Sequence, residues 1–360
     1  MNELSMLIKP ASSLCNLRCK YCFYADVSEN RDIASNGVMT EDTLDCLVQR
    51  ISEELKDGGT ANISFQGGEP TVAGLSFFQM FAEKLDVYPQ ITVNWSMQTN
   101  GTLLDEEFAQ FLHDRKFLLG VSLDGYQSMH DKNRYDAQKR GAFYRVLKGI
   151  DLLKKYKVDF NILTVVTHDL SRHPKALFDF YKKHHFDYIQ LIPCLPELNG
   201  DDRGLALLPQ DYASFYKTFF DCWKKDMEKG GQMSVSLFEN LAGMIQGIPP
   251  YQCGYIGKCV TQFVIESNGD VYPCDFYCLD ENCLGNLKEY SFSQMKESQR
   301  AKDFIASGNC KKDPCNNCQF IPVCNGGCRR QNVCWLTDDQ CAYQEVLNYI
   351  LPQLSYMLQR

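Results

Sequence analysis

The chain has 360 residues, of which 44% are hydrophobic and 23% are charged, so it can bury a substantial core and is not typical of disordered proteins. Its 37 Lys and Arg against 45 Asp and Glu give a formal net charge of −8, which argues against nucleic-acid binding through phosphate contacts. No run approaches the roughly 18 apolar residues of a membrane helix, so no membrane association is expected. Because the first residues lack the pattern of a secretory signal, we expect a cytoplasmic protein.

Short β-branched or aromatic runs alternate with longer segments of helical periodicity from residue 4 to about residue 195. This alternation predicts an α/β fold with successive parallel strands. The predicted strands are residues 6–8, 62–65, 91–97, 117–123, 160–166 and 188–192. The predicted helices are residues 40–56, 75–86, 105–115, 141–156 and 174–184. The pattern alone leaves a doubly wound sheet and a full or partial barrel open, and in each of them function gathers at the carboxyl ends of the strands.

Polar or glycine-rich segments follow the first four predicted strands. They are a cysteine-rich loop and residues 66–70, 98–101 and 122–125. Each one could be a simple turn signal, but together they indicate a ligand that lies across one rim of the sheet. We expect Tyr24, Gln66 and Asn100 to line this rim.

The composition changes after residue 200, and 12 of the 18 cysteines lie between residues 253 and 341. Clustered thiols in a chain without an export signal favour metal ligation over disulfides. Helices are predicted near residues 209–229 and 235–246, and a hairpin is predicted over residues 263–272. We therefore predict three parts: residues 1–235 as the α/β domain with connecting helices, 236–345 as a metal-organised domain, and 346–360 as a C-terminal helix.

Three cysteines with C-x3-C-x2-C spacing follow the first strand: Cys15, Cys19 and Cys22. Structural zinc sites and ordinary iron–sulfur clusters take four protein ligands, whereas this loop offers three. The trio could hold a four-iron cluster with one iron open to a substrate. In the alternative, a fourth ligand comes from elsewhere in the chain. The nearest thiol is that of Cys46, which lies on the predicted helix 40–56 and is expected to pack in the core.

This cysteine spacing, followed by Gly67-Gly68-Glu69-Pro70, resembles the radical S-adenosylmethionine enzymes. The resemblance implies a partial (β/α)6 barrel and a [4Fe-4S] cluster on Cys15, Cys19 and Cys22, whose open iron binds S-adenosylmethionine and whose reduced form splits it to a 5'-deoxyadenosyl radical. Carried over position by position, it implies that the cofactor contacts Tyr21, Gly68, Ser122, Arg134 and Leu195. Glycine permits close backbone approach and a guanidinium can bind a carboxylate with two hydrogen bonds, so the residue types suit the ligand.

The C-terminal region contains eight further cysteines whose spacing could indicate zinc ribbons. The complete spacing resembles the SPASM extension of radical S-adenosylmethionine enzymes that modify peptides. This resemblance implies two auxiliary [4Fe-4S] clusters, one on Cys253, Cys259, Cys274 and Cys328, and the other on Cys315, Cys318, Cys324 and Cys341. The crossed assignment comes from the resemblance and not from the spacing. Seven cysteines stay unassigned: Cys46, Cys194, Cys222, Cys278, Cys283, Cys310 and Cys334.

Asp275 directly follows the predicted ligand Cys274 in the string Tyr-Pro-Cys-Asp-Phe-Tyr. An aspartate in a loop is usually a solvated turn residue, but aromatic neighbours can desolvate a carboxylate and raise its pKa toward that of a usable base. The string is similar to that of anaerobic sulfatase-maturating enzymes, in which this aspartate is the proposed proton acceptor. The likeness runs from Leu7 to Cys341 and includes residues 326–330, Gly-Gly-Cys-Arg-Arg.

The resemblance implies a radical S-adenosylmethionine oxidoreductase that converts a Cys or Ser of a sulfatase polypeptide to Cα-formylglycine without oxygen. It would use three [4Fe-4S] clusters, S-adenosylmethionine and an external low-potential electron donor. One alternative is a SPASM enzyme that crosslinks or epimerises another ribosomal peptide; we expect a leader-recognition module there, for which the 14 residues before Cys15 are too few. The other is a zinc-stabilised interaction or electron-transfer protein, which would lack the about twelve irons that three clusters require.

Overall fold

The computed structural model describes residues 2–308 and 311–359. Contacts divide the chain into two compact units, which are described separately. Unit 1 comprises Met1–Ser122, Asp131–Phe160 and Val260–Ile305, and unit 2 comprises Leu123–His130, Asn161–Cys259 and Ala306–Arg360. The division at residues 235 and 345 proposed above stays a prediction. No helix in the described part of the chain combines the length and apolarity needed to cross a membrane.

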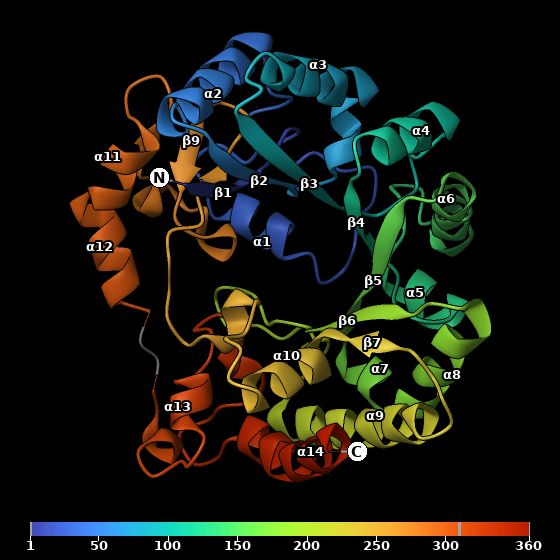
Figure 1. Cartoon of the computed structure of the whole chain (residues 1–360). Coiled ribbons are helices and arrows are strands. Elements are labelled where there is room, and N and C mark those ends of the chain that lie inside the picture. Colours follow the sequence, from blue (N-terminus) through green and yellow to red (C-terminus); the bar gives the residue numbers. More distant parts are fainter. Residues whose placement is uncertain (1, 309–310, 360) are drawn as a thin grey trace. The chain divides into compact units, whose positions relative to one another are not determined.

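Unit 1 is built on parallel strands covered by helices (Figure 1). Its first four strands are β1 (Glu3–Ile8), β2 (Gly59–Phe65), β3 (Ile91–Thr99) and β4 (Leu118–Ser122). The helices that follow are α1 (Phe23–Glu29), α2 (Glu41–Glu54), α3 (Leu75–Asp86), α4 (Glu106–Asp114) and α6 (Phe143–Tyr156). A short helix, α5 (Gln127–Asn133), spans the boundary of the units in sequence. The strand–helix alternation predicted from the sequence is confirmed here.

Local sequence signals explain where these helices begin. Thr40 caps α2, since its Oγ1 accepts a hydrogen bond of 3.3 Å from the Thr43 backbone N–H. Asp105 caps α4 in the same way, at 2.8 Å from the Phe108 N–H. On the sheet, Phe65 is fully buried and lies among the rings of Phe78, Phe81 and other aromatic residues. Apolar side chains that recur about every 3.6 residues on the helices pack against apolar side chains at every second residue of the strands, and together they form one apolar layer.

The predicted hairpin in the cysteine-rich region is confirmed and joins the same sheet. Its strands β8 (Val264–Ile265) and β9 (Asp270–Tyr272) are antiparallel, and β10 (Gly285–Asn286) pairs with β9. Strand β8 pairs in parallel with β1, which the sequence did not predict. The strand order within unit 1 is therefore β10-β9-β8-β1-β2-β3-β4. The Lys9 N–H donates to the Ile265 carbonyl at 2.8 Å just beyond the paired strands. The segment that follows Cys274 is thereby anchored in the unit that contains the first cysteine loop. Two helices, α11 (Phe292–Glu297) and α12 (Gln299–Ala306), follow the hairpin.

Unit 2 continues the alternation with parallel strands and an aromatic helical layer. Its strands are β5 (Asp159–Val166), which begins at the end of a unit 1 segment, β6 (Tyr188–Pro193) and β7 (Ser234–Val235). Its helices are α7 (His168–Ser171), α8 (Pro174–His184), α9 (Pro209–Met227), α10 (Ser236–Ile245), α13 (Ile321–Cys324) and α14 (Ala342–Leu358). Helix α14 packs against α9, and the ring of Tyr212 on α9 lies 5.3 Å from that of Trp335. These contacts give the cysteine-rich chain near residue 335 an apolar support.

Candidate active site

The loop after β1 brings the first three cysteines to the carboxyl edge of the unit 1 sheet. The Leu17 N–H donates to Cys15 Sγ at 3.3 Å, and Cys22 directly precedes α1. Burial raises the pKa of Cys15 to about 11 and also raises that of Cys22, while hydrogen bonds from backbone amides oppose both shifts. Because metal-bound thiolates are deprotonated, the amide donors around these sulfurs suit a site in which bound iron supplies the remaining positive charge.

Gly68 allows the segment directly after β2 to lie against the cysteine loop. Its N–H donates to the Ser12 carbonyl at 2.9 Å, and the next N–H, of Glu69, donates to the Leu14 carbonyl at 2.8 Å. A Cβ on Gly68 would lie 2.1 Å from the Leu14 carbonyl oxygen, closer than any real contact. Only glycine therefore permits this approach, one residue before Cys15.

Glu69 ties this segment to the end of β3. Its carboxylate accepts hydrogen bonds from the Thr71 and Thr99 hydroxyls, both at 2.6 Å, and from the Asn100 N–H at 2.7 Å. Burial raises the pKa of Glu69, and these donors oppose the shift. The Asn100 side-chain amide lies 4.0 Å from Cys15 Sγ. The carboxylate therefore fixes two of the polar segments that the sequence places on one rim.

Three of the residues assigned to the cofactor pocket or its cluster lie together. Arg134 Nη1 is 4.0 Å from Cys19 Sγ, and its guanidinium lies 5.4 Å from the centre of the Tyr21 ring. Arg134 is 8% exposed, so its charge is held close to the cysteine loop and away from bulk water. Ser122 is the last residue of β4 at the same edge of the sheet. Leu195 is half-buried and belongs to unit 2, just after β6.

Asp275 is buried and is held by Tyr24. Its Oδ2 lies 2.7 Å from the Tyr24 hydroxyl, which is also 2.9 Å from Gln66 Oε1. Its Oδ1 has no hydrogen bond and lies 3.8 Å from the ammonium group of Lys9. Burial raises the pKa of Asp275, while the charge of Lys9 and the Tyr24 hydrogen bond oppose that shift. The carboxyl group thus has one anchored oxygen and one oxygen with an unused lone pair, which is the arrangement a proton acceptor needs.

Asp275 is linked through Lys9 to a buried network of ion pairs. The Glu266 carboxylate lies 3.3 Å from Lys9 Nζ and 2.8 Å from Arg31 Nη1. Burial alone would lower the pKa of Lys9, but the charges of Cys278, Glu266 and Asp275 outweigh burial and raise it. The charges of Lys9 and Arg31 likewise outweigh the effect of burial on Glu266 and lower its pKa. Two cations and two carboxylates therefore balance one another in a site without bulk water.

No pattern in the sequence predicted a role for Lys9, Arg31 or Glu266. Lys9 and Glu266 each directly follow a buried strand, and a charged residue at that position is the signal that could have found them. Lys9 and Glu266 meet because β1 pairs with β8. Since β8 has only two residues, its sequence does not reveal this pairing.

Replacing Glu266 with Gln should destabilise the protein strongly, because buried Lys9 would then keep only Asp275 as an ionic partner and Arg31 only the more exposed Asp280. We expect a loss of about 3–5 kcal/mol of unfolding free energy. Urea denaturation of anaerobically prepared protein, followed by circular dichroism, measures it. Glu53→Gln is the matched control: its pair with Arg50 is 43% exposed on the Glu53 side, so a loss below about 1 kcal/mol is expected. Equal losses in the two variants would contradict the network's structural role.

Electrostatic effects on the pKa values show which of the remaining predicted ligands in unit 2 are neighbours. Burial raises the pKa of Cys253 to about 11, and the nearby Cys328 and Cys259 raise it further. Burial also raises the pKa of Cys341 to about 11, with Cys324 and Cys315 as its thiol neighbours. Cys253 and Cys259 thus lie near Cys328, which is far from them in sequence, whereas Cys315, Cys324 and Cys341 come from one end of the cysteine-rich region. The assignment of these thiols to two clusters stays a prediction. The fourth residue assigned to the first group, Cys274, belongs to unit 1.

These thiols also fit iron–sulfur ligation in their oxidation state, since no disulfide joins any of the cysteines that the structure describes. Cys315 and Cys324 are buried and the other assigned ligands are half-buried. Within residues 2–308 and 311–359, no three His, Cys, Asp or Glu side chains are grouped so as to bind a metal ion.

The unassigned cysteines occupy different settings. Cys278 is fully buried, and its Sγ lies 3.5 Å from the Cys274 carbonyl oxygen. Cys46 is half-buried rather than part of the core; the buried stripe of α2 passes through Leu47 and Val48 instead, because Cys46 lies at the margin of that stripe. Cys310 lies outside the described residues.

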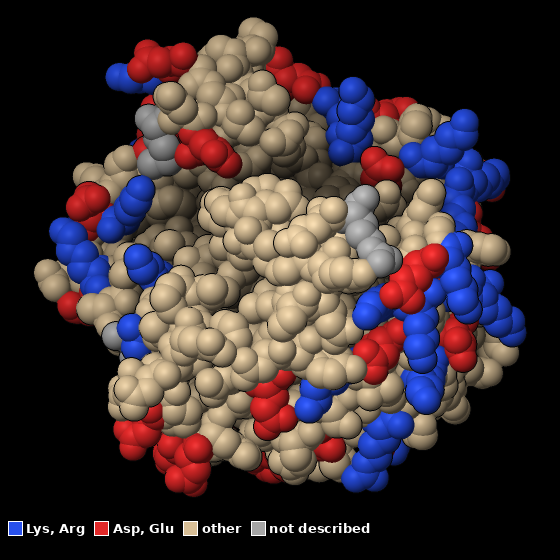
Figure 2. All heavy atoms as spheres, turned by 60° about the horizontal axis from the view of Figure 1, so that its bottom comes forward, with Lys and Arg blue, Asp and Glu red and all other residues tan. Residues whose placement is uncertain are grey.

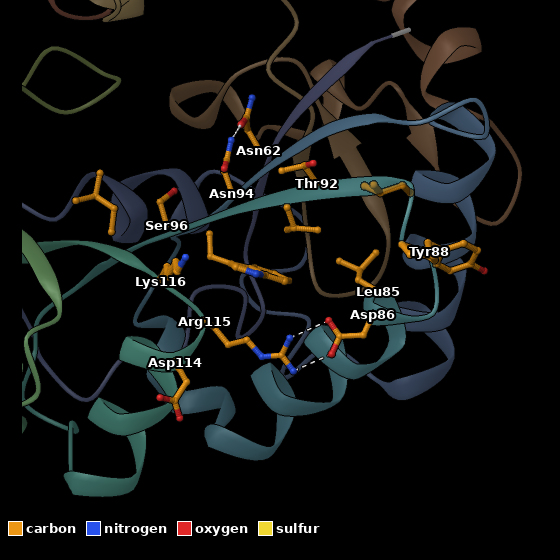
Figure 3. Close-up of a pocket in the computed structure, with 15 residues that line it drawn as sticks. Asn62, Leu85, Asp86, Tyr88, Thr92, Asn94, Ser96, Asp114, Arg115 and Lys116 are labelled. Atoms are coloured by element: carbon orange, nitrogen blue, oxygen red, sulfur yellow. Dashed lines mark hydrogen bonds and ion pairs between the residues drawn. The ribbon is translucent and has the colours of Figure 1, made fainter.

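A separate pocket lies at the amino ends of β3 and β4, the edge opposite the cysteine loop (Figure 3). Its volume is about 750 Å³, and Asn62, Asn94 and the Arg115–Asp86 ion pair contribute to its lining. It contains none of the predicted site residues. Since function in this fold gathers at the carboxyl ends of the strands, the pocket is not the catalytic site.

Both the α/β region and the cysteine-rich region match models of known protein families. A model of the radical SAM superfamily matches residues 10–181, and a model of an iron–sulfur cluster-binding domain matches residues 254–319. The chain is 44% identical over 334 residues to the cysteine-type anaerobic sulfatase-maturating enzyme of Clostridium novyi, covering 92% of this chain and 89% of the relative. The cysteine-type enzyme of Clostridium perfringens is 40% identical, with 98% of each chain covered. A serine-type enzyme of Bacteroides thetaiotaomicron is 29% identical, with 98% and 91% covered.

Solved structures agree with these relatives. The chain matches native anSMEcpe with bound AdoMet at a TM-score of 0.89 and 38% identity, covering 99% of this chain and 100% of that one. It also matches Streptococcus suis SuiB bound to precursor peptide SuiA at a TM-score of 0.65 and 19% identity, covering 93% and 76%, a likeness of fold alone. The predicted partial (β/α)6 barrel of the radical SAM fold with its cysteine-rich extension is confirmed.

Proposed function

This chain belongs to the family of anaerobic sulfatase-maturating enzymes, and on that premise we propose that it acts on a cysteine of a sulfatase polypeptide, which becomes Cα-formylglycine. The preference for cysteine over serine is supported by identities of 40–44% to cysteine-type relatives, against 28–29% to serine-type relatives. The observation that carries the proposal is the buried Asp275 carboxyl group beside Tyr24, in the same unit as the three-cysteine loop.

We assign the cofactors to the residues as follows. Cys15, Cys19 and Cys22 would hold the first [4Fe-4S] cluster, with S-adenosylmethionine against Tyr21, Gly68, Ser122, Arg134 and Leu195. The auxiliary clusters would use Cys253, Cys259, Cys274 and Cys328, and Cys315, Cys318, Cys324 and Cys341. When bound, these groups supply a carbon-centred radical that removes the Cβ hydrogen and an acceptor for a second electron. The radical SAM and iron–sulfur domains imply this chemistry.

The protein's own contribution is to take the thiol proton. Loss of the Cβ hydrogen removes one proton and one electron, and oxidation to the thioaldehyde removes the second electron with the thiol proton. Asp275 Oδ1 would accept that proton, while Tyr24 holds Oδ2 in place. Once Asp275 is protonated, Lys9 keeps its ion pair with Glu266, so the buried ammonium group retains a carboxylate partner. Water then adds to the thioaldehyde and hydrogen sulfide leaves, which gives the aldehyde of formylglycine.

The proposal includes an external low-potential electron donor and a cytoplasmic setting. Iron-ligating thiols need a reducing compartment, which the unbridged cysteines support. The donor is needed because splitting of S-adenosylmethionine consumes one electron.

Mass spectrometry of matched peptides tests the substrate assignment. Two short peptides that differ only in Cys or Ser at the first position of a C/S-x-P-x-R sequence are incubated with chemically reduced enzyme and S-adenosylmethionine. We expect aldehyde from the Cys peptide, at a rate roughly tenfold or more above that of the Ser peptide, because a pocket fitted to one atom discriminates by about that factor. Faster conversion of the Ser peptide would reverse the preference, and no aldehyde from either peptide would refute the assignment.

A further inference from the structure

Basic residues are concentrated beside the first cysteine loop. Residues 15–22 and 131–148 together contain eight Lys and Arg and two Asp, whereas the rest of this chain of net charge −8 has 29 basic and 43 acidic residues. On the face shown in Figure 2, Lys and Arg gather toward the right-hand side with some Asp and Glu among them, whereas the excess in residues 15–22 and 131–148 is established by the sequence. A local excess of one sign within a chain of the other sign needs a reason beyond solubility.

The backbone joins these two segments in unit 1. The Arg18 N–H donates to the Tyr135 carbonyl at 2.6 Å, and the Lys20 N–H donates to the Asn133 carbonyl at 3.0 Å. Arg134, between these two acceptors, reaches Cys19 Sγ. Lys20 and Lys139 both lie over the ring of Tyr135, at 6.0 and 4.1 Å from its centre, so these cations lie beside the cysteine loop. The cations of the two segments that are exposed or, for Arg145, half-buried are called the basic rim: Lys20, Lys132, Lys139, Arg140, Arg145 and Lys148.

Both acidic residues of this region form ion pairs or hydrogen bonds with other residues of the same region. Asp136 is 4% exposed and binds Arg140 at 2.9 Å and Arg145 at 3.2 Å. Asp131 Oδ1 accepts the Phe143 N–H at 2.9 Å, at the start of α6. Neither carboxylate is therefore presented to a partner, and the surface potential of the rim is set by its cations.

The rim also departs from the usual charge pattern of a helix. The first turn of α6 contains Arg145 and no acidic residue, although the positive end of the helix dipole favours acids there. Tyr144, beside it, is 67% exposed, and an exposed aromatic side chain among cations is typical of protein interfaces. Asp131 and Asp136 supply negative charge at this helix start from outside the helix, through the Phe143 N–H and Arg145, so the exposed Tyr144 among cations is the feature that points to an interface.

We propose that the basic rim is the docking surface for a small acidic protein that delivers one electron to the cluster bound by Cys15, Cys19 and Cys22. The inference rests on the proposed function, because that reaction consumes an electron at this loop. The carrier is oxidised by one electron and the cluster is reduced by one, with no bond made or broken. Opposite charge steers such a carrier to the rim and orients it there.

The test uses holoenzyme and a small acidic ferredoxin. In the variant Lys132→Glu, Lys139→Glu and Lys148→Glu, we expect the Kd for oxidised ferredoxin, measured by fluorescence anisotropy at low salt, to rise roughly tenfold or more. The KM for reduced ferredoxin should rise equally, and both effects should shrink as salt screens the charges. With dithionite as reductant, aldehyde formation should be unchanged, which separates this test from that of the proposed function.

The matched control makes the same change of net charge elsewhere in unit 1. Lys288→Glu, Lys296→Glu and Lys302→Glu alter exposed lysines near or on α11 and α12 and should leave ferredoxin binding unchanged. An unaltered Kd in the rim variant, or an equal rise in the control, would overturn the proposal. So would a raised KM for the sulfatase peptide in the dithionite assay, since the rim would then serve the substrate.

Discussion

Asp275→Asn should abolish most aldehyde formation and leave cleavage of S-adenosylmethionine substantially intact. The amide keeps the shape of the carboxyl group but cannot accept the thiol proton at Oδ1, the oxygen without a hydrogen bond. Loss of a positioned proton acceptor commonly costs roughly 10²–10⁴-fold in rate. Chromatography of 5'-deoxyadenosine and mass spectrometry of the peptide, from the same reaction, measure both steps.

The control for Asp275 is Asp303→Asn, which removes an exposed carboxylate on α12 that contacts Gln299. It should behave as the unaltered enzyme in both assays. Aldehyde formation at the normal rate in Asp275→Asn would remove this residue from proton transfer. An equal fall of both steps would instead indicate that the substitution disrupts the site as a whole.

Gly68→Ala should remove the first cluster and with it all cleavage of S-adenosylmethionine. The new Cβ would lie 2.1 Å from the Leu14 carbonyl oxygen, so the backbone next to Cys15 must move. We expect iron to fall by about four of the about twelve atoms that three clusters contain. Iron analysis and electron paramagnetic resonance of anaerobically prepared protein measure the loss.

Gly243→Ala is the matched glycine control, because its Cβ would meet only Ile248 Cβ, at an ordinary 3.6 Å. Full iron content and activity are expected there. A Gly68→Ala protein with its full iron content and normal cleavage would show that the cysteine loop does not depend on the close approach of these two segments.

Local signals in the sequence predicted much of the fold. Helices α3 and α8 match their predicted ranges, since both have clear periodicity and defined ends. The six long parallel strands were also found, because each is flanked by turn residues. Helix α1 was not predicted, since it begins at Phe23, directly after a loop whose cysteines dominate the pattern.

The candidate site was only partly predictable. The three-cysteine loop is recognised from its spacing, whereas Gly68 and Asp275 are recognised because their neighbouring residues resemble motifs of known families. The contact of Asp275 with Tyr24 joins residues separated by 251 positions, and no local pattern encodes such a contact. Lys9 and Glu266 meet for the same reason, through strands β1 and β8. The assignment of eight cysteines to two groups also depends on the tertiary fold and not on spacing.

The pairing of β1 with β8 has a consequence for biosynthesis. Strand β1 ends at Ile8, but its partner begins at Val264, so one edge of the sheet stays open on the ribosome until residues 264–265 have left the exit tunnel. At roughly 5–20 residues per second, that interval is on the order of tens of seconds. An unpaired edge invites association with other chains. Nascent chains of this protein should therefore depend on chaperones until the hairpin arrives, and the same late event assembles the surroundings of Asp275.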